Sequence, residues 1–266
     1  MRDKPIRDAL IRGVGALGLH AVKRTRRADV ADLIAKLRPL YSGVELVRLG
    51  PEGDGGYLVP DNLDGIECAF SPGVSTESGF EADLARRGIR VHLADYSVDA
   101  PAESSPQFVF EKKYLGSYPS ATTMTMDDWA ERSLDGHSGD LLLQMDIEGA
   151  EFETLLNTSH RLLERFRIMV IEFHYLHQLW NKPWFILVSR VFQKLLSSHS
   201  VVHIHPNNCC GSLKSGGLEL PRVAEFTFYR NDMFSERRFC DRFPHPLDYD
   251  NTPKSTLVLP RCWYGS

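Results

Sequence analysis

Residues 141–151 read LLLQMDIEGAE, and this stretch decides the fold. The apolar run 141–145 is typical of a fully buried strand, and it leads directly into Asp146. A helix is predicted to follow, up to about Leu156. A buried strand that ends at a carboxylate and continues into a helix is the unit of an open α/β sheet, where ligands bind beyond the carboxyl ends of the strands.

The same alternation extends on both sides of this stretch. Further strands are predicted at residues 66–70, 90–94, 108–110, 168–173, 200–205 and 223–229, and helices at 77–87, 127–133 and 184–198. Strands that alternate with helices indicate a mostly parallel sheet covered on both faces. We therefore expect a doubly wound, Rossmann-like α/β domain over residues 41–266, preceded by an extension of residues 1–40.

The extension is basic. Residues 1–38 carry a net charge of +6, which leaves −10 on the remaining 228 residues. Apolar residues recur there at near-helical spacing and predict an amphipathic helix, at Ile6, Leu10, Val14, Leu17 and Val22. A second short helix is expected at residues 29–37. Three roles stay open for residues 1–27: docking on the acidic domain, contact with a second copy in a homo-oligomer, or peripheral contact with an anionic membrane.

Composition excludes several classes of protein. The chain of 266 residues is 42% hydrophobic and 25% charged, which is ordinary for a folded soluble domain. No apolar run approaches the roughly 20 residues that a membrane-spanning helix needs. The five cysteines are odd in number and irregularly spaced, so we expect reduced thiols and a cytoplasmic protein. The basic segment lacks interleaved aromatic residues, so no nucleic-acid partner is expected.

The loops after the first two strands predict the cofactor. Gly73 follows the strand at 66–70, but neither a GxGxxG fingerprint nor a Gly-Lys-Ser/Thr loop is present. Asp95 follows the strand at 90–94, where an acidic residue can accept hydrogen bonds from ribose hydroxyls. A glycine loop and a ribose acid without diphosphate chemistry suit S-adenosylmethionine. The alternatives are a plain turn at Gly73 and a solvated carboxylate at Asp95.

The string at 142–151 resembles the signature of FkbM-like O-methyltransferases (the methyltransferase domain 21/24 type). Four other segments are similar to the same family, at residues 48–57 (RLGPEGDGGY), 69–74 (AFSPGV), 170–174 (VIEFH) and 203–208 (HIHPNN). The resemblance implies a Rossmann-like enzyme that uses S-adenosylmethionine and often methylates sugars or secondary metabolites. The expected cofactor contacts are Ser71, Gly73, Asp95, Gly55 and Gly56.

Three polar residues are predicted to form the catalytic or metal-binding cluster. Asp146 and Glu172 belong to strands that are neighbours in the methyltransferase order, and His174 alternates with Glu172 onto the same side. Carboxylates and an imidazole can bind Mg²⁺ or Mn²⁺ and lower the pKa of an acceptor hydroxyl. Alternatively, His174 acts as the general base, oriented by Asp146 or by Glu148.

Other polar residues near these strands receive more modest roles. Glu148 is expected either to cap the following helix or to join the chemistry, and Glu151 to lie on the helix surface. The pair His203 and His205 precedes two adjacent cysteines, a spacing that fits zinc poorly. Two asparagines follow that pair and suit either a turn or hydrogen bonds to a polyhydroxylated substrate, at Asn207 and Asn208.

The combined hypothesis is methyl transfer from S-adenosylmethionine to a hydroxyl of a small-molecule or oligosaccharide acceptor, with a divalent metal as an optional participant. Two alternatives remain at this point. One is a metal-dependent hydrolase that uses the same carboxylates and histidine, and the other is a binding protein that kept the fold without catalysis.

Overall fold

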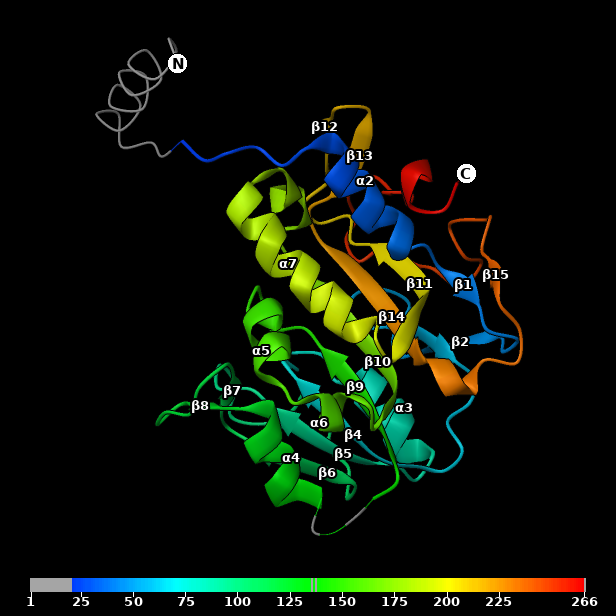
Figure 1. The fold of residues 1–266 in the computed structure, drawn as a ribbon. Coiled ribbons are helices and arrows are strands. Elements are labelled where there is room, and N and C mark those ends of the chain that lie inside the picture. Colours follow the sequence, from blue (N-terminus) through cyan, green and yellow to red (C-terminus); the bar gives the residue numbers. More distant parts are fainter. Residues whose placement is uncertain (1–20, 135, 137, 266) are drawn as a thin grey trace.

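The computed structural model describes residues 21–134, 136 and 138–265 of the chain. A seven-stranded sheet lies at its centre in the order β11-β14-β10-β9-β4-β5-β6 (Figure 1). These strands are β4 (Ile66–Pro72), β5 (Arg90–Ala94), β6 (Phe108–Glu111), β9 (Asp140–Met145), β10 (Phe166–Phe173), β11 (His199–Pro206) and β14 (Ala224–Arg230). All seven strands predicted from the sequence are confirmed, with ends that shift by at most two residues.

The topology of this sheet is that of class I methyltransferases. Counted in chain order, the seven strands lie as 3-2-1-4-5-7-6 from the β6 edge. Every neighbouring pair is parallel except the two pairs of β14, which is antiparallel to β10 and to β11. The strand order reverses between β4 and β9, where ligands bind in open α/β sheets. The prediction of a mostly parallel, Rossmann-like sheet is confirmed.

Helices cover both faces of the sheet. They are α2 (Arg27–Lys36), α3 (Gly79–Arg86), α4 (Met126–Leu134), α5 (Glu151–Asn157), α6 (His160–Leu163) and α7 (Lys182–Leu195), with 3-10 turns η1 (Leu176–Trp180), η2 (Asn231–Met233) and η3 (Arg261–Trp263). Residues of α4, α5, α6 and α7 share one hydrophobic cluster with the sheet, and α3 shares a second cluster with the opposite face. The two layers therefore enclose the sheet as the alternating pattern predicted.

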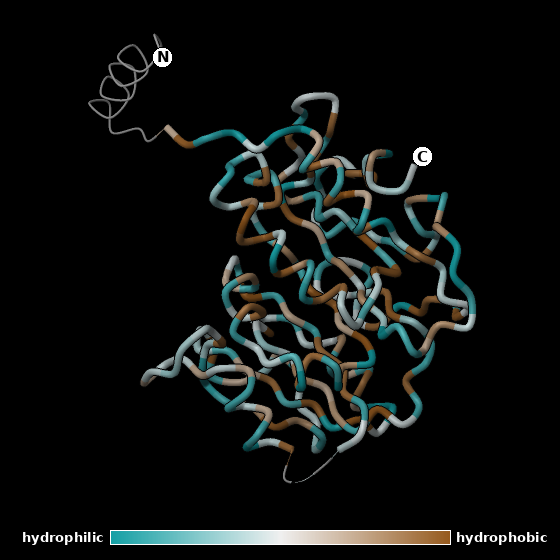
Figure 2. The backbone as a smooth tube through the Cα atoms, viewed as in Figure 1, coloured by the Kyte–Doolittle hydropathy of each residue, from teal (hydrophilic) through white to brown (hydrophobic). Residues whose placement is uncertain are grey.

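Side-chain alternation along the strands explains these two clusters. In β9, Leu141 and Leu143 join the first cluster whereas Leu142 joins the second. In β10, Met169 joins the first and Ile168 the second. Successive residues of a strand point to opposite faces, so a strand that is apolar throughout must be covered twice. Figure 2 shows the apolar segments gathered in the interior of the described chain.

Four two-stranded sheets lie around the central one. They pair β1 (Leu40–Tyr41) with β15 (Arg238–Phe239), β2 (Leu46–Leu49) with β3 (Tyr57–Pro60), β7 (Tyr114–Leu115) with β8 (Thr123–Met124), and β12 (Ser212–Ser215) with β13 (Leu218–Pro221). The β2–β3 hairpin encloses the loop that contains Gly55 and Gly56. The β12–β13 hairpin was not predicted, although its two turn glycines, Gly216 and Gly217, are a hairpin signal.

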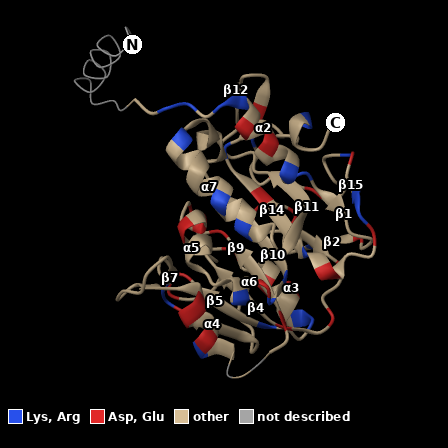
Figure 3. Cartoon of the chain, in the orientation of Figure 1, with Lys and Arg blue, Asp and Glu red and all other residues tan. Residues whose placement is uncertain are grey.

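The last part of the extension docks on the domain. Arg24 donates a hydrogen bond to Ser215 Oγ and lies 4.6 Å from the Trp180 ring centroid, and Arg27 Nε donates to the Gly216 carbonyl. Lys and Arg mark this segment in Figure 3 as it leads into α2. The short second helix is confirmed as α2, whereas the amphipathic helix predicted from Ile6 falls on residues outside the described range.

Within the part of the chain that the structure describes, none of the helices combines the length and the apolar character that a bilayer span requires.

Candidate functional site

Polar residues from four strands meet at the carboxyl ends of β4, β5, β9 and β10. A cavity of about 500 Å³ opens there, and Gly73, Asp95 and Asp146 are among its lining residues. Tyr114 and Leu115 of β7 line it as well and supply an apolar wall. A smaller cavity of about 60 Å³ adjoins it, since Gly73 and Asp146 line both. The structure thus brings the predicted cofactor loop and the predicted catalytic carboxylate to one hollow.

Gly73 allows the close approach of two backbone segments. Its φ is +90°, and a Cβ at this position would lie 1.6 Å from the carbonyl oxygen of Asp146. The Gly73 amide donates to the carbonyl of Ala94 at 2.9 Å, and the Asp146 amide donates to the carbonyl of Pro72 at 3.3 Å. Only glycine fits both the positive φ and the contact. Glycine at position 73 is therefore required by the close contact between the loop after β4 and the end of β9.

Asp95 is held rigidly at the end of β5. Its Oδ2 accepts from the amide of Ser75 at 2.9 Å, and its Oδ1 accepts from the amide and the hydroxyl of Ser97 at 2.7 and 2.6 Å. A carboxylate offers about four acceptor positions. Three are used within the protein, so one position on Oδ2 remains for a ligand hydroxyl. Asp95 is 6% exposed, which differs from the solvated alternative.

The other three predicted cofactor residues have different positions. Gly55 lines the smaller cavity, with a φ of +78°. Gly56 lies against Arg48 and Pro51, since a Cβ there would be 2.0 Å from the Pro51 carbonyl oxygen. Neither Gly56 nor Ser71 is among the residues that line the two cavities.

Ser71 belongs instead to a buried hydrogen-bonded chain that the sequence did not reveal. Its hydroxyl lies 2.5 Å from Glu81 Oε1 and 2.7 Å from Gln144 Oε1, and Gln144 Nε2 donates to the Tyr57 hydroxyl at 3.2 Å. Burial raises the pKa of Glu81 to about 7. When Glu81 is protonated, its carboxyl donates to the Ser71 hydroxyl, and the Ser71 hydroxyl donates to Gln144 Oε1. Glu81, Gln144 and Tyr57 line the smaller cavity.

Three ligand-type side chains converge beside the main cavity. Ligand atoms of Asp146, Glu148 and His174 lie within 4.8 Å of one another, the arrangement that a metal ion requires. Two of the three predicted metal ligands are in this group, but the third is Glu148 and not Glu172. Glu148 adopts a φ of +55°, and Gly149 follows at +108°. This tight turn carries the Glu148 carboxylate to 3.4 Å from His174 Nε2.

Glu148 is therefore not the helix cap that one interpretation proposed. The helix α5 begins at Glu151, and its N-cap residue is Ala150. The Glu148 side chain is 86% exposed, so it is free to contact a ligand.

Glu151 was expected on the helix surface, and this prediction is wrong. Its side chain is fully buried, and Oε1 accepts from the amide of Gly149 at 2.9 Å and lies 3.1 Å from His174 Nδ1. The first turn of α5 faces the sheet, because the turn at Glu148 and Gly149 redirects the chain. A proton on His174 Nδ1 directed at Glu151 leaves Nε2 to face Asp146 and Glu148.

The electrostatics of this group are unusual. Burial raises the pKa of Asp146 to about 7, partly opposed by the nearby His174, and its buried Oδ1 accepts no hydrogen bond. Burial favours the neutral form of His174, but the hydrogen bond to Glu151 and the charges of Asp146 and Glu148 outweigh it and raise the His174 pKa. Shifted pKa values of this kind are typical of functional sites.

Glu172 lies just behind His174, at 3.8 Å from Nε2. Burial, together with the charge of Asp146, raises the pKa of Glu172 well above its usual range. Asn207 Nδ2 donates to its Oε1 at 3.2 Å. Glu172 also pairs in register with Glu225 on β14, and two charges facing each other across strands are unfavourable. Glu172 is thus a buried neighbour of the cluster and not one of its three convergent ligands.

The two late histidines serve the C-terminal segment. His203 Nε2 lies 2.9 Å from Asp248 Oδ1, and His205 Nε2 lies 3.2 Å from Asn251 Oδ1. Asn208 also turns toward this segment and donates to the carbonyls of Thr252 and Lys254. Among the described residues, neither histidine belongs to a group of side chains that could hold a metal ion.

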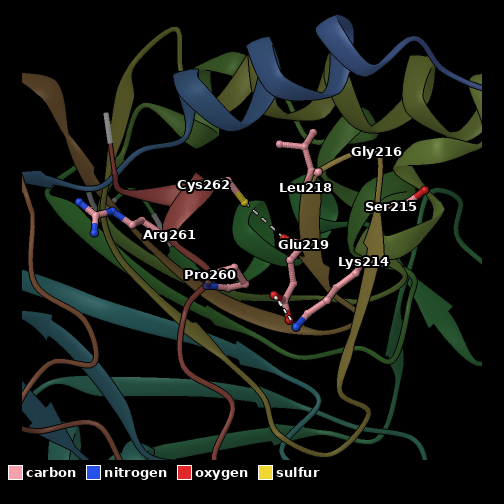
Figure 4. Close-up of a pocket in the computed structure, with 9 residues that line it drawn as sticks. Lys214, Ser215, Gly216, Leu218, Glu219, Pro260, Arg261 and Cys262 are labelled. Atoms are coloured by element: carbon pink, nitrogen blue, oxygen red, sulfur yellow. Dashed lines mark hydrogen bonds and ion pairs between the residues drawn. The ribbon is translucent and has the colours of Figure 1, made fainter.

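A second cavity of similar volume, about 510 Å³, lies elsewhere. Figure 4 shows it between the β12–β13 hairpin and residues 260–262, where Glu219 and Lys214 form an ion pair at 3.4 Å. None of the predicted catalytic or cofactor residues lines it. We therefore place the functional site at the ends of β4, β5 and β9.

The sequence model described as "Methyltransferase FkbM domain" matches residues 74–203, which include Asp95, Asp146 and His174. With its sheet topology, this match defines the class of the protein as a methyltransferase of Rossmann-like fold. The matched segment is similar to an FkbM methyltransferase domain, a family that implies the use of S-adenosylmethionine. Among curated proteins, none matches the sequence significantly.

Solved structures of methyltransferases align with the chain at low identity. The N-methyltransferase NodS from Bradyrhizobium japonicum WM9 is 11% identical, with a TM-score of 0.32, over 63% of this chain and 87% of that one. A putative methyltransferase of an antibiotic biosynthesis pathway from Anabaena variabilis is 11% identical, with a TM-score of 0.27, over 70% and 68%. A putative RNA methyltransferase from Pyrococcus horikoshii is 12% identical, with a TM-score of 0.30, over 77% and 99%.

Proposed function

We propose that this protein transfers the methyl group of S-adenosylmethionine to a hydroxyl of a saccharide or glycosylated acceptor. The observation that carries the proposal is the shared cavity, in which the loop at Gly73, the acid Asp95 and the cluster at Asp146 lie together. For methyl transfer to an alcohol, the methyl donor and the group that removes the hydroxyl proton must both lie next to the acceptor.

The residues present fit the cofactor. Gly73 lines the cavity, Asp95 keeps one acceptor position for a ribose hydroxyl, and Tyr114 with Leu115 offers an apolar wall to an adenine ring. When bound, S-adenosylmethionine supplies an electrophilic methyl group on a sulfonium. Ser71 and Gly56 support the loops of this site from behind, without lining it.

His174 is suited to remove the acceptor proton. Glu151 fixes Nδ1, so that Nε2 is the free base and faces the cavity side of the cluster. Buried Glu151 also stabilises the imidazolium that forms when the proton arrives. The raised pKa of His174 makes it a stronger base, which general-base catalysis can use.

A metal-assisted reaction is the second candidate, favoured by the convergence of Asp146, Glu148 and His174. A hard cation such as Mg²⁺ or Mn²⁺ bound there would position the acceptor hydroxyl and lower its pKa. Glu151 would then hold the ligating imidazole through Nδ1, as outer carboxylates commonly do in metal sites. Full activity after exhaustive chelation would exclude a required metal and leave His174 as the base.

Titration calorimetry with S-adenosylhomocysteine tests the cofactor directly. We expect binding in wild type and a loss of about tenfold or more in Asp95→Ala, since a hydrogen bond to a charged group contributes roughly 1.5–3 kcal/mol. Absence of binding at millimolar ligand would contradict the proposal and favour a hydrolase. Binding without turnover across a panel of saccharides would favour a non-catalytic binding protein.

The basic segment ahead of α2 is the remaining part of the proposal. Arg24 and Arg27 contact the β12–β13 hairpin of the same chain, which supports docking on its own domain over an oligomeric or membrane role. Size-exclusion chromatography and liposome sedimentation of a chain that lacks residues 1–20 test this. An altered oligomeric state or lost sedimentation would contradict it.

A further inference from the structure

Two adjacent thiols lie in the turn between β11 and β12. The Sγ atoms of Cys209 and Cys210 are 2.7 Å apart, and both cysteines are reduced in the structure. Cys210 is exposed, whereas Cys209 is partly buried. Gly211 follows with a φ of +68° and with open space around its Cα. The two sulfur atoms are therefore close enough to form a disulfide after a small movement. The open space at Gly211 leaves room for the backbone of the turn to rearrange.

We propose that Cys209 and Cys210 are a reversible oxidation site, which closes to a disulfide between adjacent residues. Consecutive Cα atoms are about 3.8 Å apart, whereas disulfides usually join Cα atoms about 4.4–6.8 Å apart. A disulfide between neighbours is therefore strained, and strained or exposed disulfides are easily reduced. Such a bond is suited to a switch and not to structural cross-linking.

The reaction balances with a low-molecular-weight disulfide such as glutathione disulfide as the oxidant. The exposed Cys210 attacks one sulfur of the oxidant as a thiolate, and the first glutathione thiolate leaves. Cys209 then attacks the Cys210 sulfur of the mixed disulfide, and the second glutathione thiolate leaves. Two thiol protons are released and two electrons pass to the oxidant. Burial and the contact with Cys210 raise the pKa of Cys209 to about 12. Cys210 is the more exposed of the two thiols, so the oxidant reaches it first.

The turn is connected to the catalytic cluster by two hydrogen bonds. The Cys209 amide donates to Asn207 Oδ1 at 2.8 Å, and Asn207 Nδ2 donates to Glu172 Oε1 at 3.2 Å. Glu172 in turn lies 3.8 Å from His174 Nε2. The ring of the disulfide contains the peptide unit between Cys209 and Cys210. Closing it reorients the backbone of Cys209 and withdraws the amide that fixes Asn207.

Oxidation should therefore weaken the contact between Asn207 and Glu172 and lower the rate of methyl transfer. This consequence rests on the proposed function, whereas the formation of the disulfide does not. The contact of Lys254 should weaken on oxidation as well, because its ammonium donates to the Cys209 carbonyl at 2.5 Å. The C-terminal segment is thus coupled to the same turn.

Intact-mass spectrometry of the full chain after treatment with glutathione disulfide tests the site. We expect wild type to lose two hydrogen atoms without retaining glutathione, and we expect peptide mapping to locate the bond between Cys209 and Cys210. Cys210→Ser should lose this reaction, and Cys240→Ser, the matched control, should keep it. Dithiothreitol should restore the reduced mass. A stable glutathione adduct on wild type, or loss of two hydrogens in Cys210→Ser, would overturn the proposal.

Activity and ligand binding give the second measurement. Oxidised wild type should turn over several-fold more slowly than the reduced protein, with recovery on reduction, and Cys210→Ser should not respond to the oxidant. Asn207→Ala should reproduce the loss in reduced protein. If the disulfide forms but neither state methylates an acceptor or binds S-adenosylhomocysteine, the proposed function fails and the oxidation site stands. If turnover is normal and no disulfide forms, the oxidation site fails alone.

Discussion

The two halves of the central sheet build the site by different means. At the ends of β4 and β5, most of the hydrogen bonds involve backbone groups. Gly73 and Asp95 are each held by residues close in sequence or at the end of the adjacent strand. At the ends of β10, β14 and β11, polar side chains find partners 26–46 residues away, as Asn207 does with Glu172. The geometry around Gly73 and Asp95 thus rests mainly on backbone contacts between neighbouring strands, whereas the charged network around Glu172 depends on contacts between side chains.

The largest effect is expected from Gly73→Ala. The new methyl group meets the Asp146 carbonyl, and the positive φ adds strain, each at a cost of roughly 1–3 kcal/mol. We expect the affinity for S-adenosylhomocysteine to fall about 100-fold, measured by calorimetry. Gly88→Ala is the matched control, because Gly88 has a φ of +81° with open space around it. Equal effects of both variants would contradict the role of the close approach.

Glu151→Gln should have the next largest effect, in the other half of the site. The amide keeps the size of the side chain but removes the charge that holds His174 Nδ1. Loss of such an orienting carboxylate typically reduces activity about 10–100-fold. We expect kcat to fall while the affinity for S-adenosylhomocysteine is unchanged. Glu153→Gln, at an exposed position of the same helix, should retain full activity. A fall in cofactor affinity instead would mean that Glu151 supports the cofactor loop.

Glu81 predicts a pH dependence of stability on the cofactor side. Its folded pKa of about 7 lies above the ordinary value of 4.5, so the fold favours the protonated form. The contribution is complete below pH 4.5 and is lost as the pH rises through 7, by about 3 kcal/mol in total.

Urea unfolding at pH 5, 6, 7 and 8 measures this loss. Glu81→Gln should flatten the profile, because the amide cannot ionise. Glu131→Gln, an exposed control on α4, should keep the slope of wild type. A wild-type profile that rises from pH 5 to 8 in parallel with that of Glu81→Gln would contradict the assignment.

Arg24→Ala should have the smallest effect, since it removes only the contacts of one exposed side chain with the β12–β13 hairpin and Trp180. The contact of Arg24 with the Trp180 ring and its hydrogen bond to Ser215 suggest a loss of about 0.5–1 kcal/mol in the free energy of unfolding. Lys23→Ala is the neighbouring control, because its side chain is exposed. Equal stability of the two variants in urea unfolding would show that the docking contributes nothing.

The central sheet was predictable because its signals are local. Apolar runs such as 141–145 specify buried strands, and the residues that follow them specify the cofactor loop and Asp146. The β1–β15 and β7–β8 pairs were missed, since their strands have two residues each and leave no periodic pattern. The β12–β13 hairpin was missed as well, although its two turn glycines are a hairpin signal in the sequence.

Predictions about individual carboxylates were less successful. Glu148, and not Glu172, converges with Asp146 and His174, because a positive φ at Glu148 is a property of the folded turn that its residue type disfavours. Glu151 was placed on the surface because it follows directly after a glycine turn, and only the packing of α5 against β10 buries it. Ser71 faces Glu81 and Gln144 because alternation along β4 directs it away from the cavity.

By itself, the sequence determined the class of fold, the family and the strand ends at which the site lies, because apolar periodicity and the residues after each strand are local properties of the chain. The tertiary structure decided which carboxylates contact His174, which carboxyl groups have a pKa raised by burial, and how close the Sγ atoms of the two adjacent cysteines lie. Those properties depend on burial and on distances between side chains far apart in sequence, and such distances exist only once the layers have packed.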